Sequence, residues 1–347
     1  MILTNYLRRQ VFKPFLATSL VLVGIFVAFM AARYLAQAAE GKIPAQVIGR
    51  LILLRVLIAQ EVLLPTTLYF SVLLALGRLY REAEIVAMFA AGFSFKRVCW
   101  SVLSLALLLS LLTGLFSLKV RPWAWGEFYR LKALSQRAFD LSRLRAGVFY
   151  ELPEDRVFLA EKIDREKALA EGVFLYEHPS SGPKVIRAQK ARQEIKSQGI
   201  FLLFDHGYQY EFDQKKALFL LSEFETLRIF VAPLEVSEKT KVKAWPTSLL
   251  WPPRGPQEMA EWQWRLSAPL STLLLAFLAL NLSPVKPREG YLKRFPLAVL
   301  FFALFFYSGA ILKKMLAKGL FPPWPGVFTA HLGLFFLALV SYFWTRR

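Results

Sequence analysis

The order of apolar and polar positions divides the chain into long apolar runs and one long mixed stretch. A run needs about 20 residues to cross a bilayer as a helix. Six such runs occur, three before the mixed stretch and three after it: 15–35, 52–76, 98–119, 266–283, 295–312 and 326–344. The pattern predicts an α-helical membrane protein with six transmembrane helices in a 3 + 3 arrangement. We see no sequence repeat between the two halves.

The mixed stretch, 121–262, has the pattern of strands after a helical segment at 122–145 that continues the third run. Six strand-like segments follow: GVFYEL (147–152), RVFLAEKID (156–164), EGVFLYEH (171–178), PKVIRAQKA (183–191), GIFLLFDHGYQYEF (199–212) and KALFLLSEFETLRIFV (216–231). Strands at this spacing predict an antiparallel all-β domain, as a sandwich or an open roll. We therefore divide the chain into helices over 1–120, this β domain with its linkers over 121–262, and helices over 263–347.

A short amphipathic segment, 79–93, separates the second and third runs. In a helix, its apolar positions Leu79, Val86, Phe89 and Phe93 would share one side. Gly92 is placed to end such a helix, and Ser94 to cap the next one. The segment is too short and too charged to span a membrane.

Two interpretations of this segment are open: a helix that lies in the bilayer interface, or a coupling helix that docks into a groove on a cytoplasmic motor. Its charged residues are Arg78, Arg81, Glu82 and Glu84. An interfacial helix favours Lys and Arg on its polar face, whereas anionic headgroups repel acids. Glu82 and Glu84 therefore suit a basic protein groove better.

Composition agrees with a membrane protein and charge suggests its orientation. The chain has 347 residues, of which 56% are hydrophobic, and a mean hydropathy of +0.40. The net charge of +19 is uneven, because 121–262 has 22 Lys and Arg against 20 Asp and Glu. The basic excess therefore lies on the apolar part. This distribution is typical of membrane orientation and anionic lipid, and it argues against nucleic acid as a partner.

The short loops predict which side faces the cytoplasm. With the N-terminus inside, the inner segments 1–14, 77–97, 284–294 and 345–347 contain 13 Lys and Arg, and the outer segments 36–50 and 313–325 contain five. The bias predicts that both termini are cytoplasmic and that the β domain lies outside, in the periplasm of a bacterial inner membrane protein. A cleaved signal peptide ending near LAQAAEG is the alternative for the first run, but that run is too long for a signal sequence and five more follow.

Several cations sit at the expected outer boundary, against the usual bias. Eighteen residues from Phe15 rise about 27 Å, which places Arg33 near the outer edge of the hydrocarbon layer. Lys313 and Lys314 end the fifth run at the same level, and Lys42 lies a little beyond. These side chains either snorkel to the interface or bind an anionic headgroup. Phosphates of a lipid would be the natural ligands.

The sequence offers no catalytic set, metal site or cofactor motif. It contains no phosphate-binding loop, nucleophile elbow or zinc-protease helix, its one cysteine is Cys99, and its three histidines share no ligand spacing. Glu61 is the one acid well inside an apolar run. It is either a hydrogen-bonded packing residue near Pro65 or part of a proton relay, for which Arg55 is the only nearby partner.

Together these segments resemble the LptF/LptG permeases of the lipopolysaccharide exporter. The similarity runs nearly end to end: NYLRRQVFKPF at the start, EGKIPA (40–45), LPTTLYFSVLLALGRLYREAEIVAMFAAGFS (64–94), AEWQWRLSAPLS (260–271), NLSPVKPREG (281–290) and ILKK (311–314). The WR-x-S-x-PLS entry to the fourth run favours the LptF side of the family.

The resemblance implies a fold, a complex and several site residues. It implies six spans with a periplasmic β-jellyroll, and assembly with an LptG-like permease, two copies of an LptB-like cytoplasmic ATPase and an LptC-like protein. Glu84 matches the coupling-helix glutamate that contacts the ATPase, with Glu82, Arg81 and Phe89 beside it. Arg33 and Lys313 match basic positions associated with the lipopolysaccharide phosphates. Met30 departs from relatives that have a further basic residue there.

We therefore expect a non-enzymatic permease subunit that extracts lipopolysaccharide from the inner membrane while a partner hydrolyses ATP. Three other classes are open. A mechanotransmission protein would usually have four spans, and a proton-driven lipid carrier would need ionisable pairs at mid-membrane. A membrane-anchored enzyme would need a catalytic set.

Overall fold

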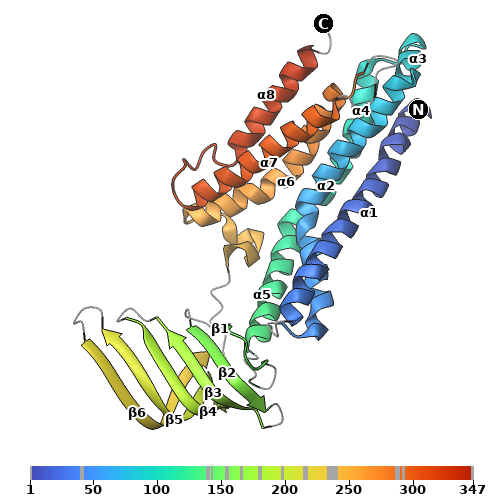
Figure 1. Cartoon of the computed structure of the whole chain (residues 1–347). Coiled ribbons are helices and arrows are strands. Elements are labelled where there is room, and N and C mark those ends of the chain that lie inside the picture. The colour runs from blue at the N-terminus through green and yellow to red at the C-terminus, as the bar shows by residue number, and fades with distance from the viewer. Residues whose placement is uncertain are drawn as a thin grey trace. The chain divides into compact units, whose positions relative to one another are not determined.

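The computed structural model describes residues 2–39, 43–137, 141, 144–152, 156–164, 167–178, 182–196, 199–213, 218–232, 241–285, 290 and 294–344. Two compact units share these residues (Figure 1). The helical unit comprises Met1–Ala32, Gly49–Tyr129 and Thr240–Arg347, and the sheet unit comprises Arg33–Ile48 and Arg130–Lys239. Lys42 lies outside the described residues.

The helical elements follow the predicted apolar runs closely. They are α1 (Ile2–Ala39), η1 (Ala45–Val47), α2 (Ile48–Arg81), α3 (Glu84–Ala90), α4 (Phe95–Leu115), the π-helix η2 (Phe116–Val120), α5 (Arg121–Arg137), η4 (Val242–Ala244), η5 (Thr247–Leu250), α6 (Pro256–Leu282), α7 (Phe295–Ala317) and α8 (Phe328–Trp344). As expected, α5 continues the helix of the third run through η2. The predicted spans 15–35, 52–76 and 295–312 fall within α1, α2 and α7. Span 98–119 runs through α4 and η2, and spans 266–283 and 326–344 match α6 and α8 to within two residues.

Four helical segments are long and apolar enough to cross a membrane: Ile2–Ala39, Phe95–Lys132, Pro256–Leu282 and Phe295–Ala317. Of the other two predicted spans, α8 is a shorter apolar helix. The second, α2, has 34 residues and includes several charged ones. The architecture of apolar helices with an inserted β domain is confirmed, and the count of six spans stays a prediction.

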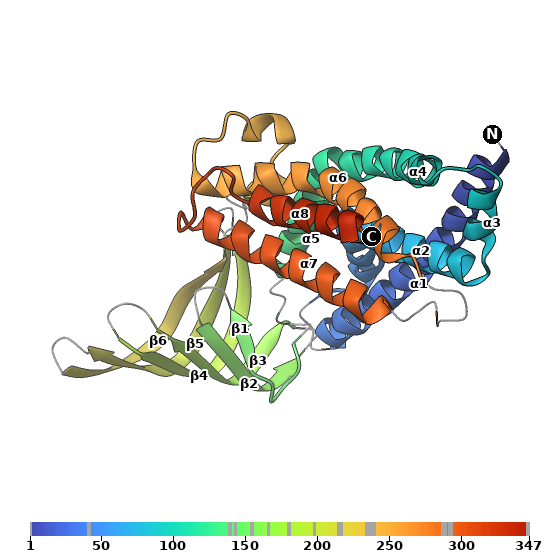
Figure 2. The same cartoon turned by 90° about the horizontal axis from the view of Figure 1, so that it is seen from above.

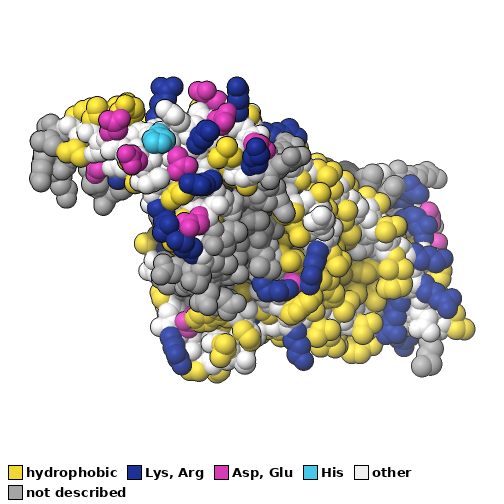
Figure 3. Space-filling view, turned by 90° about the horizontal axis from the view of Figure 1, so that it is seen from below, with side chains coloured by type: hydrophobic (Ala, Val, Ile, Leu, Met, Phe, Trp, Pro, Cys, Tyr) yellow, Lys and Arg dark blue, Asp and Glu magenta, His cyan; other side chains and the backbone are white. Residues whose placement is uncertain are grey.

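Helix α6 is the centre of the helical unit and packs against α4, α7 and α8 (Figures 1 and 2). Of its most apolar window, 61% is buried, against 11% for the windows of α1 and α7. Figure 3 shows hydrophobic side chains over much of one face of the helices. Apolar helix faces that the chain itself leaves uncovered are typical of contact with lipid or with another protein, and α1 and α7 have such faces.

The segment 79–93 is not the single helix that its pattern predicted. Helix α2 runs through Arg81, and Ala83, with a positive φ of 58°, separates it from the seven-residue α3. The break shifts the helical phase, so the buried residues of α3 are Ile85 and Met88, whereas the predicted Val86 and Phe89 are exposed. Gly92 follows α3 with φ of 82°, as expected. Ser94 occupies the N-cap position of α4, but its side chain makes no capping hydrogen bond.

The sheet unit contains one antiparallel sheet of six strands in chain order. The strands are β1 (Tyr150–Leu152), β2 (Arg156–Asp164), β3 (Leu169–Glu177), β4 (Lys184–Lys196), β5 (Gly199–Asp213) and β6 (Leu218–Ala232). All six predicted strands are present. Of the two predicted architectures, a single sheet fits the open roll, and the described strands follow one another as a meander, without the crossovers of a two-sheet jellyroll.

The buried face of the sheet changes phase along one row. The pairing registers place residues 161, 172, 189, 206 and 225 in one row across β2 to β6. Gly172 and His206 in that row have positive φ values of 60° and 51°. Because a residue with positive φ turns the strand, buried positions on either side are three apart rather than two. The row is where the sheet bends.

Candidate functional site

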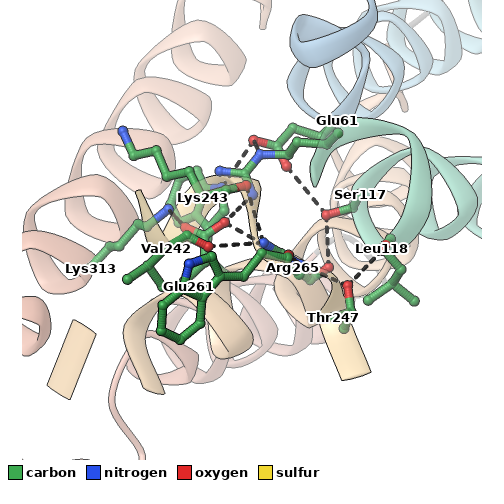
Figure 4. Close-up of polar contacts among 12 residues, drawn as sticks. Glu61, Ser117, Leu118, Val242, Lys243, Thr247, Glu261, Arg265 and Lys313 are labelled. Carbon is green, nitrogen blue, oxygen red and sulfur yellow. Dashed lines mark hydrogen bonds and ion pairs between the residues drawn. The ribbon is translucent and has the colours of Figure 1, made fainter. Parts of the chain in front are cut away.

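Five charged side chains from four helices meet where α6 begins and α7 ends; we call them the charge cluster (Figure 4). They are Glu61 of α2, Arg121 of α5, Glu261 and Arg265 of α6, and Lys313 of α7. At most 8% of the side chain is exposed in the first four, against 19% in Lys313. Charges this deeply buried require partners.

The two carboxylates of the charge cluster are bridged by Arg121. Its Nε lies 2.9 Å from Glu61 Oε1, and its Nη1 donates to Glu261 Oε1. The same Glu261 oxygen accepts from Arg265 Nε at 3.2 Å. Helices α2, α5 and α6 are therefore joined through one chain of ion pairs.

The π-helix η2 places polar groups against this chain of ion pairs. A π-helix bonds i→i+5, so it is tolerated only over short stretches and often occurs at functional sites. Ser117 Oγ donates to Glu61 Oε2 at 3.2 Å and to the Arg265 carbonyl at 3.0 Å. The Leu118 carbonyl accepts from Thr247 Oγ1 at 2.6 Å. The irregular helix thus connects the charge cluster to the chain that returns from the β domain.

Arg265 holds that return segment, residues 241–250, which lies between β6 and α6. Its Nη1 donates to the Trp245 carbonyl at 2.9 Å and to Thr247 Oγ1 at 2.8 Å. Its Nη2 donates to the carbonyls of Val242 and Lys243 at 3.4 and 3.2 Å. With Nε on Glu261, the whole guanidinium fork is used, which explains how a fully buried arginine is tolerated.

Lys313 is the most accessible member of the charge cluster. Its Nζ lies 2.8 Å from Glu261 Oε2 and 4.5 Å from the centre of the Trp264 ring. The indole of Trp264 donates in turn to Glu61 Oε1 at 3.1 Å. The neighbouring Lys314 is exposed. Of these two lysines, both predicted to bind lipid phosphates, Lys313 reaches the charge cluster and Lys314 does not.

A cavity of about 50 Å³ borders Glu61 and Trp264 and extends between α6, α7 and α8 to Ser271 and His331. Ser271 Oγ and His331 Nε2 are 2.9 Å apart. A cavity of this size holds one or two waters, so it is too small for an acyl chain. For Glu61, the structure gives Arg121 as the ion-pair partner. The expected Arg55 instead places its guanidinium 4.8 Å from the Trp125 ring and 4.2 Å from that of Phe128.

The remaining residues predicted to bind phosphate lie elsewhere. Arg33 is exposed on the part of α1 that belongs to the sheet unit. Lys42 lies outside the described residues. The structure therefore brings one of the four predicted cations, Lys313, into a cluster with other charged side chains.

The residues predicted to contact an ATPase lie around α3. Glu84 is its first residue, and its Oε2 accepts a hydrogen bond from the Tyr6 hydroxyl of α1 at 2.7 Å. Arg81 Nη2 lies 3.3 Å from Glu82 Oε1, and both side chains are exposed. Val86 and Phe89 are 48% and 37% exposed. Residues 82–90, here called the surface segment, thus present two acids and two apolar side chains.

Sequence reasoning missed most of the charge cluster. Arg121, Glu261 and Arg265 lie at the ends of apolar runs, where charged residues are ordinary. One local signal was present: Glu261 and Arg265 are spaced i,i+4 with the acid first, the favourable order on a helix. Their partners on α2, α5 and α7 come from distant parts of the chain, so no spacing rule could reveal them.

A bundle of apolar helices with an inserted β domain is typical of an integral membrane protein. The family model for the lipopolysaccharide export system permeases LptF/LptG matches residues 5–346. The chain belongs to this family of permeases, and it is a multi-pass protein of the inner membrane.

Curated relatives agree over nearly the full length. The chain is 25% identical to the lipopolysaccharide export system permease protein LptF of Escherichia coli K12, over 99% of this chain and 95% of that protein. Proteins of the same name from Escherichia coli O157:H7 and Shigella flexneri match to the same extent. The resemblance found in the sequence is therefore confirmed at the level of the family.

Proposed function

We propose that this chain is the permease subunit of an ATP-driven exporter that extracts lipopolysaccharide from the inner membrane and passes it to a periplasmic bridge. The family match over residues 5–346 is the observation on which the proposal rests. ATP is hydrolysed on a separate LptB-like dimer, and an LptG-like chain completes the membrane part. An LptC-like protein receives the lipid from the β domain.

The surface segment supports a docking site for the ATPase. Its short helix lies between α2 and α4, and its exposed Val86 and Phe89 have apolar area that the chain itself leaves uncovered. Exposed apolar residues beside acids fit a protein groove with basic and apolar walls. The hydrogen bond from Tyr6 to Glu84 gives α1 a direct link to this site.

The uncovered faces of α1 and α7 support a second membrane subunit and a lipid path. In each helix only 11% of the most apolar window is buried within the chain. Movement of the surface segment would shift these helices against their LptG-like counterparts and open a lateral path to lipopolysaccharide. Lys313 at the end of α7 and Arg33 on α1 would then bind its phosphates, because both can form charge-assisted hydrogen bonds to phosphate oxygens.

The orientation of the helical unit supports a cytoplasmic docking site. Helix α1 begins and α8 ends toward the end of the unit that includes α3 (Figures 1 and 2). Exposed basic residues, among them Arg9, Lys13, Arg78 and Lys96, belong to the same end. By the positive-inside rule this end is cytoplasmic, and the β domain is periplasmic.

Co-purification from membranes tests the assembly. We expect an ATPase and a second multi-span chain to accompany the wild-type protein, and Glu84→Ala to reduce the ATPase recovered while the second chain stays bound. Lys96→Ala, an exposed change at the start of α4, is the control. Full recovery of the ATPase with Glu84→Ala would contradict the proposal that the surface segment is its docking site.

Lipid-stimulated ATP hydrolysis tests the phosphate ligands. Arg33→Glu and Lys313→Gln should each weaken stimulation by lipopolysaccharide in the reconstituted complex. Glutamine at 313 avoids placing a third carboxylate in the charge cluster. Unchanged stimulation by both variants would mean that Arg33 snorkels and Lys313 serves only the fold.

A further inference from the structure

The charge cluster is one negative charge short. Arg121, Arg265 and Lys313 contribute three positive charges, whereas Glu61 and Glu261 contribute two negative ones. The two arginines and both carboxylates are almost fully buried, and only Lys313 has a side chain accessible to a fifth of its area. Among the members of the charge cluster, Lys313 is therefore the one beside which a further anion can bind from outside.

We infer that Glu261 is an internal counter-anion that occupies Lys313 until a phosphate group of the lipid substrate displaces it. This inference rests on the proposed function and adds the regulation of its phosphate site. With Lys313 bound to Glu261 the site is closed, and with Lys313 bound to phosphate it is filled. The incoming phosphate supplies at least the one negative charge that the cluster lacks.

The two oxygens of Glu261 have separate partners, which makes the exchange possible. Oε1 accepts from Arg121 and Arg265, whereas Oε2 accepts from Lys313. Glu261 therefore keeps two charged donors when Lys313 leaves. An uncompensated buried carboxylate would be costly, and this arrangement avoids it.

Lys313 is also the member best suited to change partners. An ammonium is a point charge with three donors and no fixed plane, so it can turn from one anion to another without loss of geometry. The Trp264 ring beneath its Nζ favours the cation in either state. Arg265, in contrast, is fixed by four acceptors of the return segment and cannot rotate freely.

An internal competitor lowers the apparent affinity for substrate. A site that is open for a fraction of the time binds with a dissociation constant divided by that fraction. If Lys313 is free about a tenth of the time, removing the competing contact tightens binding about tenfold. For a transporter, the benefit is release of the lipid, because Lys313 can pair with Glu261 again as the phosphate leaves.

The experiment measures binding of lipid A to the assembled complex in detergent. Glu261→Asp keeps the charge for the two arginines but shortens the reach toward Lys313, and we expect about tenfold tighter binding. Glu261→Gln should act in the same direction, and Glu261→Asp covers the case in which the glutamine variant fails to fold. Glu258→Asp, one turn earlier on α6, is the matched control and should bind like the wild type. Combining Glu261→Asp with Lys313→Gln should abolish the gain.

Two further ligands identify the source of the phosphate. Dephosphorylated lipid A should bind all variants alike. Inorganic phosphate should bind every variant far more weakly than lipid A does, because it lacks the acyl chains, and equal affinity for the two ligands would overturn the assignment to a lipid-borne phosphate.

The outcomes separate this inference from the proposed function. Wild-type binding of lipid A that is weakened by Lys313→Gln but not strengthened by Glu261→Asp overturns the inference and leaves the proposed function standing. A gain with Glu261→Asp that persists in the double variant also overturns it. A complex with no affinity for lipid A overturns the proposed function and the inference with it.

Discussion

The charge cluster and the surface segment both gather charged residues at ends of the same helical bundle, yet they are built in opposite ways. In the charge cluster four of five side chains are nearly inaccessible, and each has partners on another helix or on the return segment. In the surface segment, the side chain of Glu82 is 40% exposed, and its ion-pair partner is Arg81, the preceding residue in the chain.

The difference separates a cluster that fixes the packing of the helices from a surface that is available to another molecule. A buried ion pair contributes little net stability, but losing one partner is costly, so such pairs mainly fix geometry. An exposed ion pair contributes at most about 1 kcal/mol. The charge cluster therefore holds α2, α5, α6, α7 and the return segment together, whereas the surface segment leaves its side chains available to another molecule.

Arg265→Met should have the largest effect on stability, because Arg265 is the residue of the charge cluster that contacts both Glu261 and the return segment. The change leaves Glu261 short of a partner and frees three carbonyls of the return segment. The loss should be about 3–5 kcal/mol, seen as a lower midpoint of thermal unfolding in detergent. Arg254→Met, an exposed position just before α6, should change stability by less than about 0.5 kcal/mol. Equal midpoints for the two variants would contradict the view that the charge cluster fixes the packing of the helices.

Neighbouring positions in α3 test the same distinction within the surface segment. Ile85 is fully buried and Val86 is exposed. Ile85→Ala should cost about 2–4 kcal/mol by leaving a cavity, and Val86→Ala should cost almost nothing while reducing recovery of the ATPase. Unfolding in detergent and co-purification measure the two quantities. A stability loss at Val86 as large as that at Ile85 would show that the segment belongs to the core.

The loop between α7 and α8 is held against α6 next to the charge cluster. A substitution there should have a third, smaller effect on stability. Gln263, between Glu261 and Arg265 on α6, donates to the Pro323 carbonyl at 2.7 Å and accepts from the Val327 amide at 2.8 Å. Gly326 has φ of 58°, and an added Cβ would meet Gln263 Oε1 at 2.1 Å. Gly326→Ala should therefore cost about 2 kcal/mol, whereas Gly333→Ala, with open space around it, should be neutral or stabilising.

The fold could largely be predicted from the sequence, because each element has its own periodicity. Apolar runs of bilayer length mark α1, α4, α6 and α7, and alternation over short segments marks all six strands. The sheet row at Gly172 and His206 could not be predicted, since a positive φ at histidine leaves no trace in the pattern.

The site was harder to predict for two physical reasons. In the surface segment, one left-handed residue, Ala83, broke the helix and moved the buried face from Val86 to Ile85. In the charge cluster, Glu61, Arg121 and Lys313 meet only after the helices pack, so their pairing is a property of tertiary structure. The sequence did single out Glu61 and Lys313 as unusual, and both belong to the charge cluster.

The smallest effect on stability, and the closest test of the surface segment, is expected from Tyr6→Phe. This change removes one hydroxyl that donates to Glu84 at 2.7 Å and leaves the ring in place. A hydrogen bond to a charged group contributes about 1.5–3 kcal/mol when buried, and solvent reduces this to about 1 kcal/mol where the group is partly exposed, so the free energy of unfolding should change little. Recovery of the ATPase should stay near the wild-type level, because Glu84 keeps its carboxylate and loses only its hydrogen bond to α1.

What should change with Tyr6→Phe is the connection between the docking site and α1. ATP hydrolysis by the complex should persist, but its stimulation by lipopolysaccharide should fall, because movement of Glu84 no longer pulls on the start of α1. Tyr342→Phe, at the end of α8, removes a hydroxyl elsewhere in the helical unit and is the control. If stimulation survives Tyr6→Phe unchanged, the surface segment reaches the membrane helices by its covalent connection to α2 and α4, and the contact with Tyr6 has no part in the coupling.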